Sequence, residues 1–181
     1  QDPTEPLDNQ QFVAQMAQFS MVSGIEGLQK SFSGVADSFS AGQSLQAASL
    51  VERQVLSESS QTWLDADGYM AGVLMVPDGA SQVSAQIKDA SGGLVKRVNF
   101  GAVTGGSHRF MWDGFTEDGS AAPPGTYSVS AQALVGGGLV GVTTQLYNAV
   151  DSVTIDRASN TISLNLANGE TIDLTEVEEF K

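Results

Sequence analysis

The stretch FMWDGFTEDGSAAPPGTYSVSA, residues 110–131, holds two alternating apolar runs separated by a long connection. Asp113-Gly114 and Asp118-Gly119 are turn dipeptides, because glycine accepts a positive φ without a steric penalty. Pro123-Pro124 stiffens the end of the connection before Gly125. The stretch therefore predicts a strand, a turn and a second strand. We expect four of its side chains to lie in the core of a β-sandwich: Phe110, Trp112, Tyr127 and Val129.

The period-2 pattern of this stretch continues on both sides of it, from about residue 47 to the end. Asn168-Gly169 predicts a two-residue hairpin turn within the tail, which reads as a succession of short strands. Many short strands separated by turn signals indicate an all-β sandwich or barrel. The predicted strands before the tail are 50–57, 69–76, 83–89, 94–100, 108–112, 126–135 and 139–147.

Residues 1 to about 45 have a different period. Apolar residues recur here every three or four positions, which is typical of an amphipathic helix or a coiled-coil seam. Glycines at 24, 27, 34 and 42 each weaken a helix by roughly 1 kcal/mol relative to alanine, so the helix needs a partner. We favour self-association or partner binding over packing on the chain's own β region. The predicted contact face is Phe12, Met16, Phe19, Val22, Ile25 and Leu28, and the stripe continues through Phe32, Val35 and Phe39.

Charge and composition exclude several classes of partner and site. The formal net charge of −13 argues against nucleic acid and against an anionic membrane surface. The absence of cysteine removes thiol catalysis, disulfides and thiolate zinc sites, and favours the cytoplasm or an export route without oxidative folding. No apolar run approaches the ~20 residues of a membrane span. Because the chain starts at Gln1, we expect it to be a fragment of a longer protein.

Several residue patterns could carry chemistry, and each has a simpler interpretation. The DADG (65–68) and TEDGS (116–120) segments share residues with calcium loops but predict turns. GGGLVG (136–141) lacks the lysine of a phosphate loop and predicts a hairpin tip. His108 could join a serine and an acid, but no nucleophile-elbow motif is present. Trp63 and Trp112 are expected to be buried anchors, with exposure and partner contact as the alternative. We expect no enzyme activity and no catalytic, cofactor-binding or metal residues.

Two segments resemble the flagellar hook-capping (FlgD) family. QDPTEPLDNQQFVAQMAQFSMVSGIEGL (1–28) is similar to the family's N-terminal motif, and FMWDGFTEDGSAAPPGTYSV (110–129) to its F-x-WDG…PxGxYxV element. The first motif is the more specific, since the second also occurs in other immunoglobulin-like modules. Twelve positions match the first motif: Gln1, Asp2, Pro3, Pro6, Asp8, Asn9, Phe12, Gln15, Ala17, Gln18, Phe19 and Ser20.

The resemblance implies a mainly β fold with an unusual discontinuity. A fibronectin III/immunoglobulin-like β-sandwich (69–145) is expected to be inserted into a Tudor-like β-barrel (47–68 and 146–181), preceded by an amphipathic N-terminal helical segment (1–45). Periodicity does not show this insertion, which follows from the resemblance.

The resemblance also implies a role in assembly. Members cap the distal end of the growing bacterial flagellar hook as a homo-oligomer, taken to be a pentamer. They promote folding and insertion of exported hook protein and leave the finished flagellum. They are made in the cytoplasm and exported by the flagellar type III apparatus with an uncleaved N-terminal signal. The alternative function is an immunoglobulin-like module that binds carbohydrate or peptide.

Overall fold

The computed structural model describes residues 7–66, 68–156, 159 and 161–181, with side chains from Gln11 onward. Motif positions 1–6 and Asp67 of the DADG segment lie outside the described residues, as do the side chains of Asp8 and Asn9. The chain divides into two units, residues 1–45 and 46–181, and each is described by itself.

The described residues of the first unit form a single helix, α1 (Leu7–Ala48), whose last turn belongs to the second unit. The predicted N-terminal helical segment is confirmed, and the helix runs without a break through all four glycines. A Cβ added at any of these glycines would meet nothing within 4 Å, so neighbouring side chains do not require them. Among the described residues, no helix is long and apolar enough to span a membrane.

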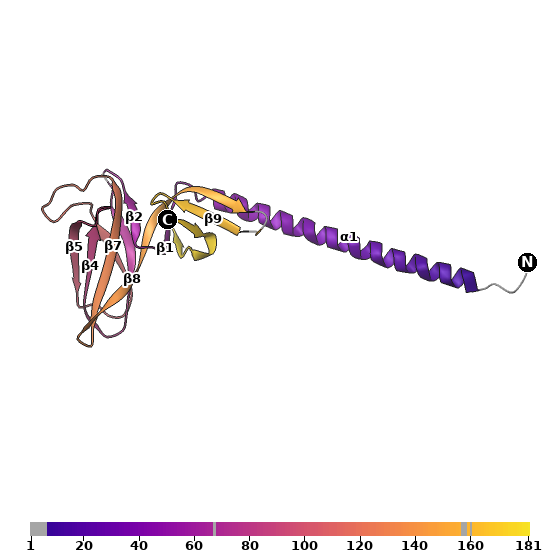
Figure 1. The fold of residues 1–181 in the computed structure, drawn as a ribbon, viewed down its shortest axis with the longest axis horizontal. Helices are drawn as coiled ribbons and strands as arrows, with labels where there is room; N and C mark the ends of the chain where they lie inside the picture. Colours follow the sequence, from indigo (N-terminus) through magenta and orange to yellow (C-terminus); the bar gives the residue numbers. More distant parts are fainter. Residues whose placement is uncertain (1–6, 67, 157–158, 160) are drawn as a thin grey trace, which may run out of the picture. The chain divides into compact units, whose positions relative to one another are not determined.

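The second unit is mainly β, as predicted. One sheet has the strand order β6-β3-β8-β1-β11, and the other places β5, β4 and β7 side by side (Figure 1). β2 pairs with the start of β7, and all of these pairs are antiparallel. The bounds of the strands are β1 (Gln54–Glu58), β2 (Gln61–Leu64), β3 (Met70–Val76), β4 (Ala80–Lys88), β5 (Leu94–Gly101), β6 (Gly106–Trp112), β7 (Gly125–Val135), β8 (Gly138–Asp156) and β11 (Glu179–Phe180).

β8 is the strand that joins the parts of this unit. Its first residues pair with β7, its middle with β3 and β1, and its last seven residues with β9 (Thr161–Leu166). β9 pairs in turn with β10 (Thr171–Asp173), after which a short 3₁₀ helix, η1 (Leu174–Glu176), leads to β11. The predicted strand 139–147 thus continues to Asp156, because its hydrogen-bonding partners change along one extended segment.

Three clusters of buried hydrophobic residues include residues of β8, and the two larger ones form the main cores. The larger is the sandwich core, which includes the four predicted residues Phe110, Trp112, Tyr127 and Val129. The smaller contains Leu50, Val55, Val150, Leu164 and Leu166, from both ends of the unit's sequence. Leu64 of β2 belongs to the larger core although it precedes residue 69. The domain boundaries and the Tudor-like character of the smaller part stay predictions.

The quoted stretch forms the strand, turn and strand that its pattern predicts. Trp112, at the end of β6, donates from Nε1 to the carbonyl of Phe115 at 2.8 Å, and Tyr127 donates from its hydroxyl to the carbonyl of Pro123 at 2.7 Å. Gly114 has φ +77°, and a Cβ there would lie 2.8 Å from the carbonyl oxygen of Gly68. The glycine is therefore required for both backbone conformation and space.

Two local expectations are wrong. Trp63 was expected to be buried but is 44% exposed, because it occupies an outward position in β2, a strand that the sequence pattern did not show. The hairpin between β9 and β10 has a three-residue loop rather than a two-residue one. Leu166 N donates to Glu170 O at 2.8 Å, and Gly169 N to Leu166 O at 2.9 Å, so the loop is residues 167–169. Gly169 has φ +87°, the left-handed conformation that such a loop requires.

Candidate functional site

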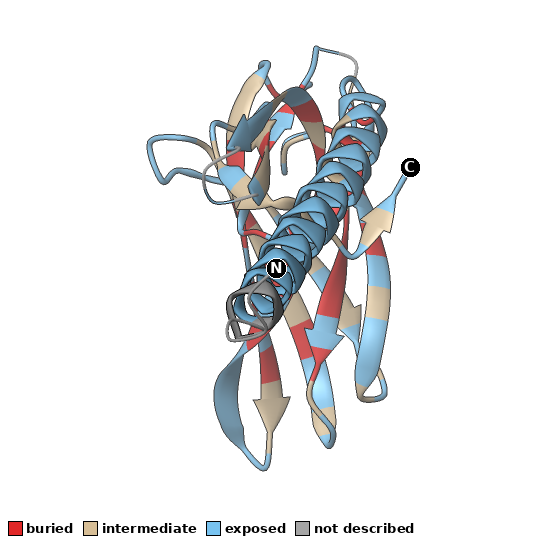
Figure 2. Ribbon diagram, turned by 90° about the vertical axis from the view of Figure 1, so that its right-hand side faces the viewer, coloured by how far each residue is buried: buried red, intermediate tan, exposed pale blue. Residues whose placement is uncertain are grey.

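The exposed apolar stripe of α1 is the strongest candidate for a functional surface. Its nine large side chains are between 51% exposed at Val22 and 81% exposed at Phe32. Figure 2 shows α1 pale blue, hence exposed, along most of its length. Large contiguous apolar surfaces on a folded protein mark interaction sites. The members of the stripe are Phe12, Met16, Phe19, Val22, Ile25, Leu28, Phe32, Val35 and Phe39.

The polar residues of α1 carry little charge. Between residues 11 and 45 the charged side chains are Glu26, Lys30 and Asp37. Ser31 and Ser38 donate their hydroxyls to the carbonyl oxygens of the residues four positions earlier, at 2.9 and 2.8 Å. Such bonds satisfy the serine hydroxyls within the helix itself. The surface around the stripe is therefore poorly suited to electrostatic recognition and well suited to apolar packing.

The structure separates the two predicted sets of residues. The six predicted contact residues, Phe12 to Leu28, all lie exposed on α1. The four predicted core residues lie in the other unit, buried in the sandwich. The contact role of the six stays a prediction.

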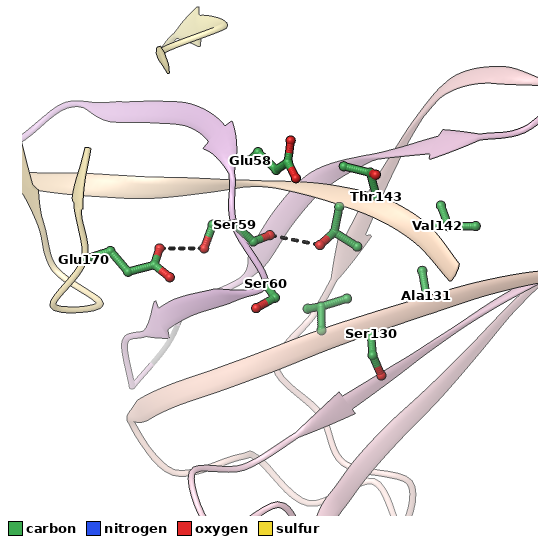
Figure 3. Close-up of a pocket in the computed structure, with 10 residues that line it drawn as sticks. Glu58, Ser59, Ser60, Ser130, Ala131, Val142, Thr143 and Glu170 are labelled. Atoms are coloured by element: carbon green, nitrogen blue, oxygen red, sulfur yellow. Dashed lines mark hydrogen bonds between the residues drawn. The ribbon is translucent and has the colours of Figure 1, made fainter. Parts of the chain in front are cut away.

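The second unit contains a groove where β7 and β8 separate beside the β1–β2 connection. The groove has a volume of about 450 Å³, and Figure 3 shows Glu58, Ser59 and Glu170 along its wall. Ser59 donates from Oγ to Glu170 Oε2 at 2.7 Å, and Asn168 Nδ2 donates to the same oxygen at 2.8 Å. The bond from Ser59 attaches the segment between β9 and β10 to the β1–β2 connection, and the bond from Asn168 holds the Glu170 carboxylate in place within that segment. The groove's hydroxyl and carboxylate thus have a structural role.

His108 does not take part in a catalytic arrangement with this groove. It lies on β6, and its Nε2 is 2.6 Å from the carbonyl oxygen of Thr104. The described residues that line the groove include serines and glutamates but not His108. Sequence alone could not decide this, because the spacing of His108 from the serines does not show which of them lie near it.

The carboxylate of Asp118, in the Asp-Gly turn at 118–119, stabilises the turn itself. Thr116 donates its hydroxyl to Asp118 Oδ1, and Ser120 N donates to the same oxygen at 3.2 Å. The Thr116 hydroxyl, followed by the backbone N–H of Ser120, holds the pKa of Asp118 below its ordinary value. Within the part of the chain that the structure describes, no group of three or more histidine, aspartate or glutamate side chains is placed to hold a metal ion.

Comparison with known families gives two matches in the order that the two motifs predict. The model described as "Flagellar hook capping protein - N-terminal region" matches residues 1–34, and the "FlgD Ig-like domain" model matches residues 59–138. The first match covers most of the exposed stripe. The second begins before residue 61 and so includes β2.

Two relatives are similar in sequence to this chain over nearly its whole length. The basal-body rod modification protein FlgD of Escherichia coli (strain K12) is 33% identical over 96% of this chain and 78% of its own length. The protein of the same name from Salmonella typhimurium is 34% identical over 99% of this chain and 80% of its own length.

Solved structures are similar as well. Crystallised FlgD from P. aeruginosa matches with a TM-score of 0.66 and 35% identity, over 73% of this chain and 98% of that one. FlgD from Xanthomonas campestris, whose structure is described in terms of hook capping essential for flagellar assembly, matches with a TM-score of 0.64 and 33% identity, over 77% of this chain and 99% of that one. The chain belongs to the FlgD family of flagellar hook-capping proteins.

Proposed function

We propose that this chain is a capping scaffold of the growing bacterial flagellar hook. The observation that supports it is that the hook-capping N-terminal region, residues 1–34, coincides with most of the exposed apolar stripe on α1. A surface of this kind suits a protein that works by binding others rather than by chemistry. The stripe would supply the contacts of the cap, and the second unit would fold separately and act as its body.

The finer features of this role follow from the resemblance. The cap sits at the distal end of the hook as a homo-oligomer, expected to be a pentamer, and promotes folding and insertion of hook protein. It leaves when the hook is complete, and it is not an enzyme. The chain reaches this place through the flagellar type III apparatus. The lack of cysteine supports that route, because the chain can fold after export without forming disulfides.

The alternative function, a carbohydrate- or peptide-binding module, is less well supported. Of its two candidate contact residues, Trp112 is 2% exposed and packed in the sandwich core, which leaves Trp63. The comparisons with hook-capping proteins favour the assembly role.

The test is complementation of a flagellated strain that lacks its own hook-capping gene, with hooks observed by electron microscopy. Phe19→Glu, introduced into the full-length gene, should abolish hooks, because a charge cannot enter an apolar contact without a large desolvation penalty. Ser33→Glu places the same charge on the exposed polar side of α1, one helical turn from Lys30 and Asp37 and away from the stripe, and should leave hooks normal. Normal hooks with Phe19→Glu, at normal protein levels, would overturn the proposal.

A further inference from the structure

The apolar stripe does not run straight along α1. From Phe12 to Phe39, eight steps cover 27 residues, an average of about 3.4 residues per step, whereas one turn of an α-helix takes 3.6. Each step therefore falls about 22° short of a full turn. Because α1 is continuous over this whole range, the shortfall accumulates to about half a turn around the helix axis.

The stripe is consequently divided into two faces. Phe12, Met16 and Phe19 form what we call the N-terminal face. The C-terminal face lies about 160° around the axis at 3.6 residues per turn, and Val22 and Ile25 cross between the two. The C-terminal face consists of Leu28, Phe32, Val35 and Phe39.

The charged residues of α1 show that the polar side of the helix also changes direction around the axis. At 100° per residue, Glu26, Lys30 and Asp37 point in the same direction as the N-terminal face, but from the second half of the helix. A straight neighbour that covered the N-terminal face would therefore meet these charges farther along. It would leave the C-terminal face uncovered on the other side.

A single coiled partner could not follow the stripe either. Half a turn in 27 residues corresponds to a full turn in about 80 Å at 1.5 Å per residue. Two-stranded coiled coils turn once in about 140–210 Å. The two faces therefore require two neighbours.

We propose that both neighbours are copies of this chain, and that the N-terminal face of one copy packs on the C-terminal face of the next. This inference rests on the proposed function, whose oligomeric cap it explains. A contact between two different faces of identical subunits repeats head to tail, and it forms a closed ring when the rotation between neighbours closes. α1 is then the element that links each copy to the copy before it and the copy after it.

Charge favours copies of the chain as the occupants. Residues 46–181 hold 16 acidic and seven basic side chains, so the second units of two copies repel each other. Residues 11–45 hold two acidic side chains and one basic one. The helices are thus the part of the chain through which strongly acidic molecules can meet with little repulsion.

The size of each face favours a ring over a pair. Seven side chains, four of them phenylalanine, would bury roughly 900 Å² in one contact between the two faces. Stable interfaces bury about 1,200–2,000 Å², so one contact alone is weak. In a ring every copy makes two such contacts, and closure adds to their stability.

The test uses purified full-length protein and two variants, Phe19→Glu on the N-terminal face and Phe32→Glu on the C-terminal face. Masses are measured by sedimentation as a function of concentration, with Ser33→Glu, on the charged side of the helix, as the matched charge control. We expect the unmodified chain and Ser33→Glu to form species larger than a dimer at high concentration. Each face variant alone should be monomeric, because it lacks one half of every contact. At the highest concentrations, where a single weak contact still forms, an equimolar mixture of the two variants should recover a 1:1 dimer, in which the intact C-terminal face of Phe19→Glu meets the intact N-terminal face of Phe32→Glu.

Three results would overturn the inference. The unmodified chain could stay monomeric at all concentrations, either variant could still form large species alone, or the mixture could recover no dimer. The proposed function fails separately, through normal hooks in cells that carry Phe19→Glu. If Phe19→Glu abolishes hooks but the mixture recovers no dimer, the stripe binds another hook component. That result would reject the head-to-tail contact.

Discussion

Trp112 packs edge-on against Tyr127, with ring centroids 5.3 Å apart and an interplanar angle of 63°. The two residues come from β6 and β7, which lie in opposite sheets of the sandwich, and each also forms a hydrogen bond to the connection between those strands. One aromatic pair therefore joins the two sheets and anchors the long turn.

Trp112→Ala should lower the free energy of unfolding of the second unit by about 3–5 kcal/mol, because it leaves a large cavity and removes the Nε1 hydrogen bond. Urea denaturation followed by circular dichroism measures this. Trp63→Ala is the control, since Trp63 is 44% exposed, and it should lose much less. Equal losses for the two variants would contradict the core assignment.

Gly72→Ala and Gly141→Ala should have different effects on stability although both are in strands of the sandwich. A Cβ at Gly72 would collide with the carbonyl oxygen of Gln145 and lie 2.8 Å from Cδ2 of Leu146. We expect a loss of about 1–3 kcal/mol in unfolding free energy from this overpacking. A Cβ at Gly141 would meet nothing within 4 Å, so this change should be neutral or stabilising by up to about 1 kcal/mol. Thermal denaturation compares the two, and a harmless Gly72→Ala would show that β3 and β8 are not packed as described.

Glu170→Ala should loosen the attachment of the loop between β9 and β10. The change removes the oxygen that accepts hydrogen bonds from Ser59 and Asn168, and we expect a loss of about 1–3 kcal/mol. Amide hydrogen exchange should accelerate in residues 166–171 more than in β4. Asp151→Ala removes an equal charge from an exposed position and should leave this exchange unchanged. Equal acceleration in both variants would show that the effect is one of charge.

Asp89 should make stability sensitive to acid. The Ser91 hydroxyl, followed by the backbone N–H of Gly93, lowers the pKa of Asp89 from its ordinary value near 3.9. A carboxyl group whose pKa is lower in the folded state stabilises that state above its unfolded pKa. This contribution is lost as the pH falls below about 4 through the folded pKa.

Asp89→Asn should therefore lose less stability than the unmodified chain between pH 6 and pH 3, measured by urea midpoints. Ser91→Ala should raise the pKa of Asp89, measured by NMR titration, and an unchanged value would contradict the assigned cause.

Sequence patterns predicted the elements whose signals are local. The three- and four-residue spacing from Phe12 to Phe39 predicted the helix, and alternation around Phe110 and Tyr127 predicted two sandwich strands. β2 was missed because it has only four residues and its partners in β7 are 61 to 67 positions away in sequence. The length of β8 was missed because a strand that changes partners carries no mark of the change.

The candidate site was only partly readable from sequence. Spacing identified the residues of the stripe, but six of them were expected to share one contact face. Their division between two sides became clear once α1 was known to be continuous through Gly24 and Gly27, since a break there would have allowed the stripe to realign. Groove residues such as Ser59 and Glu170 are 111 positions apart and could not be associated from sequence.

The central claim, that the stripe of α1 is the assembly surface, is tested most directly by site-specific photo-crosslinking in cells that are building hooks. A photo-reactive amino acid is placed at position 19, 32 or 33 of the full-length protein, and the products are identified by mass spectrometry. We predict strong crosslinks from positions 19 and 32 to other copies of the chain, and weak or no crosslinks from position 33, on the polar side of the helix. Equal crosslinking from all three positions, or products from positions 19 and 32 that never include a second molecule, would contradict the account.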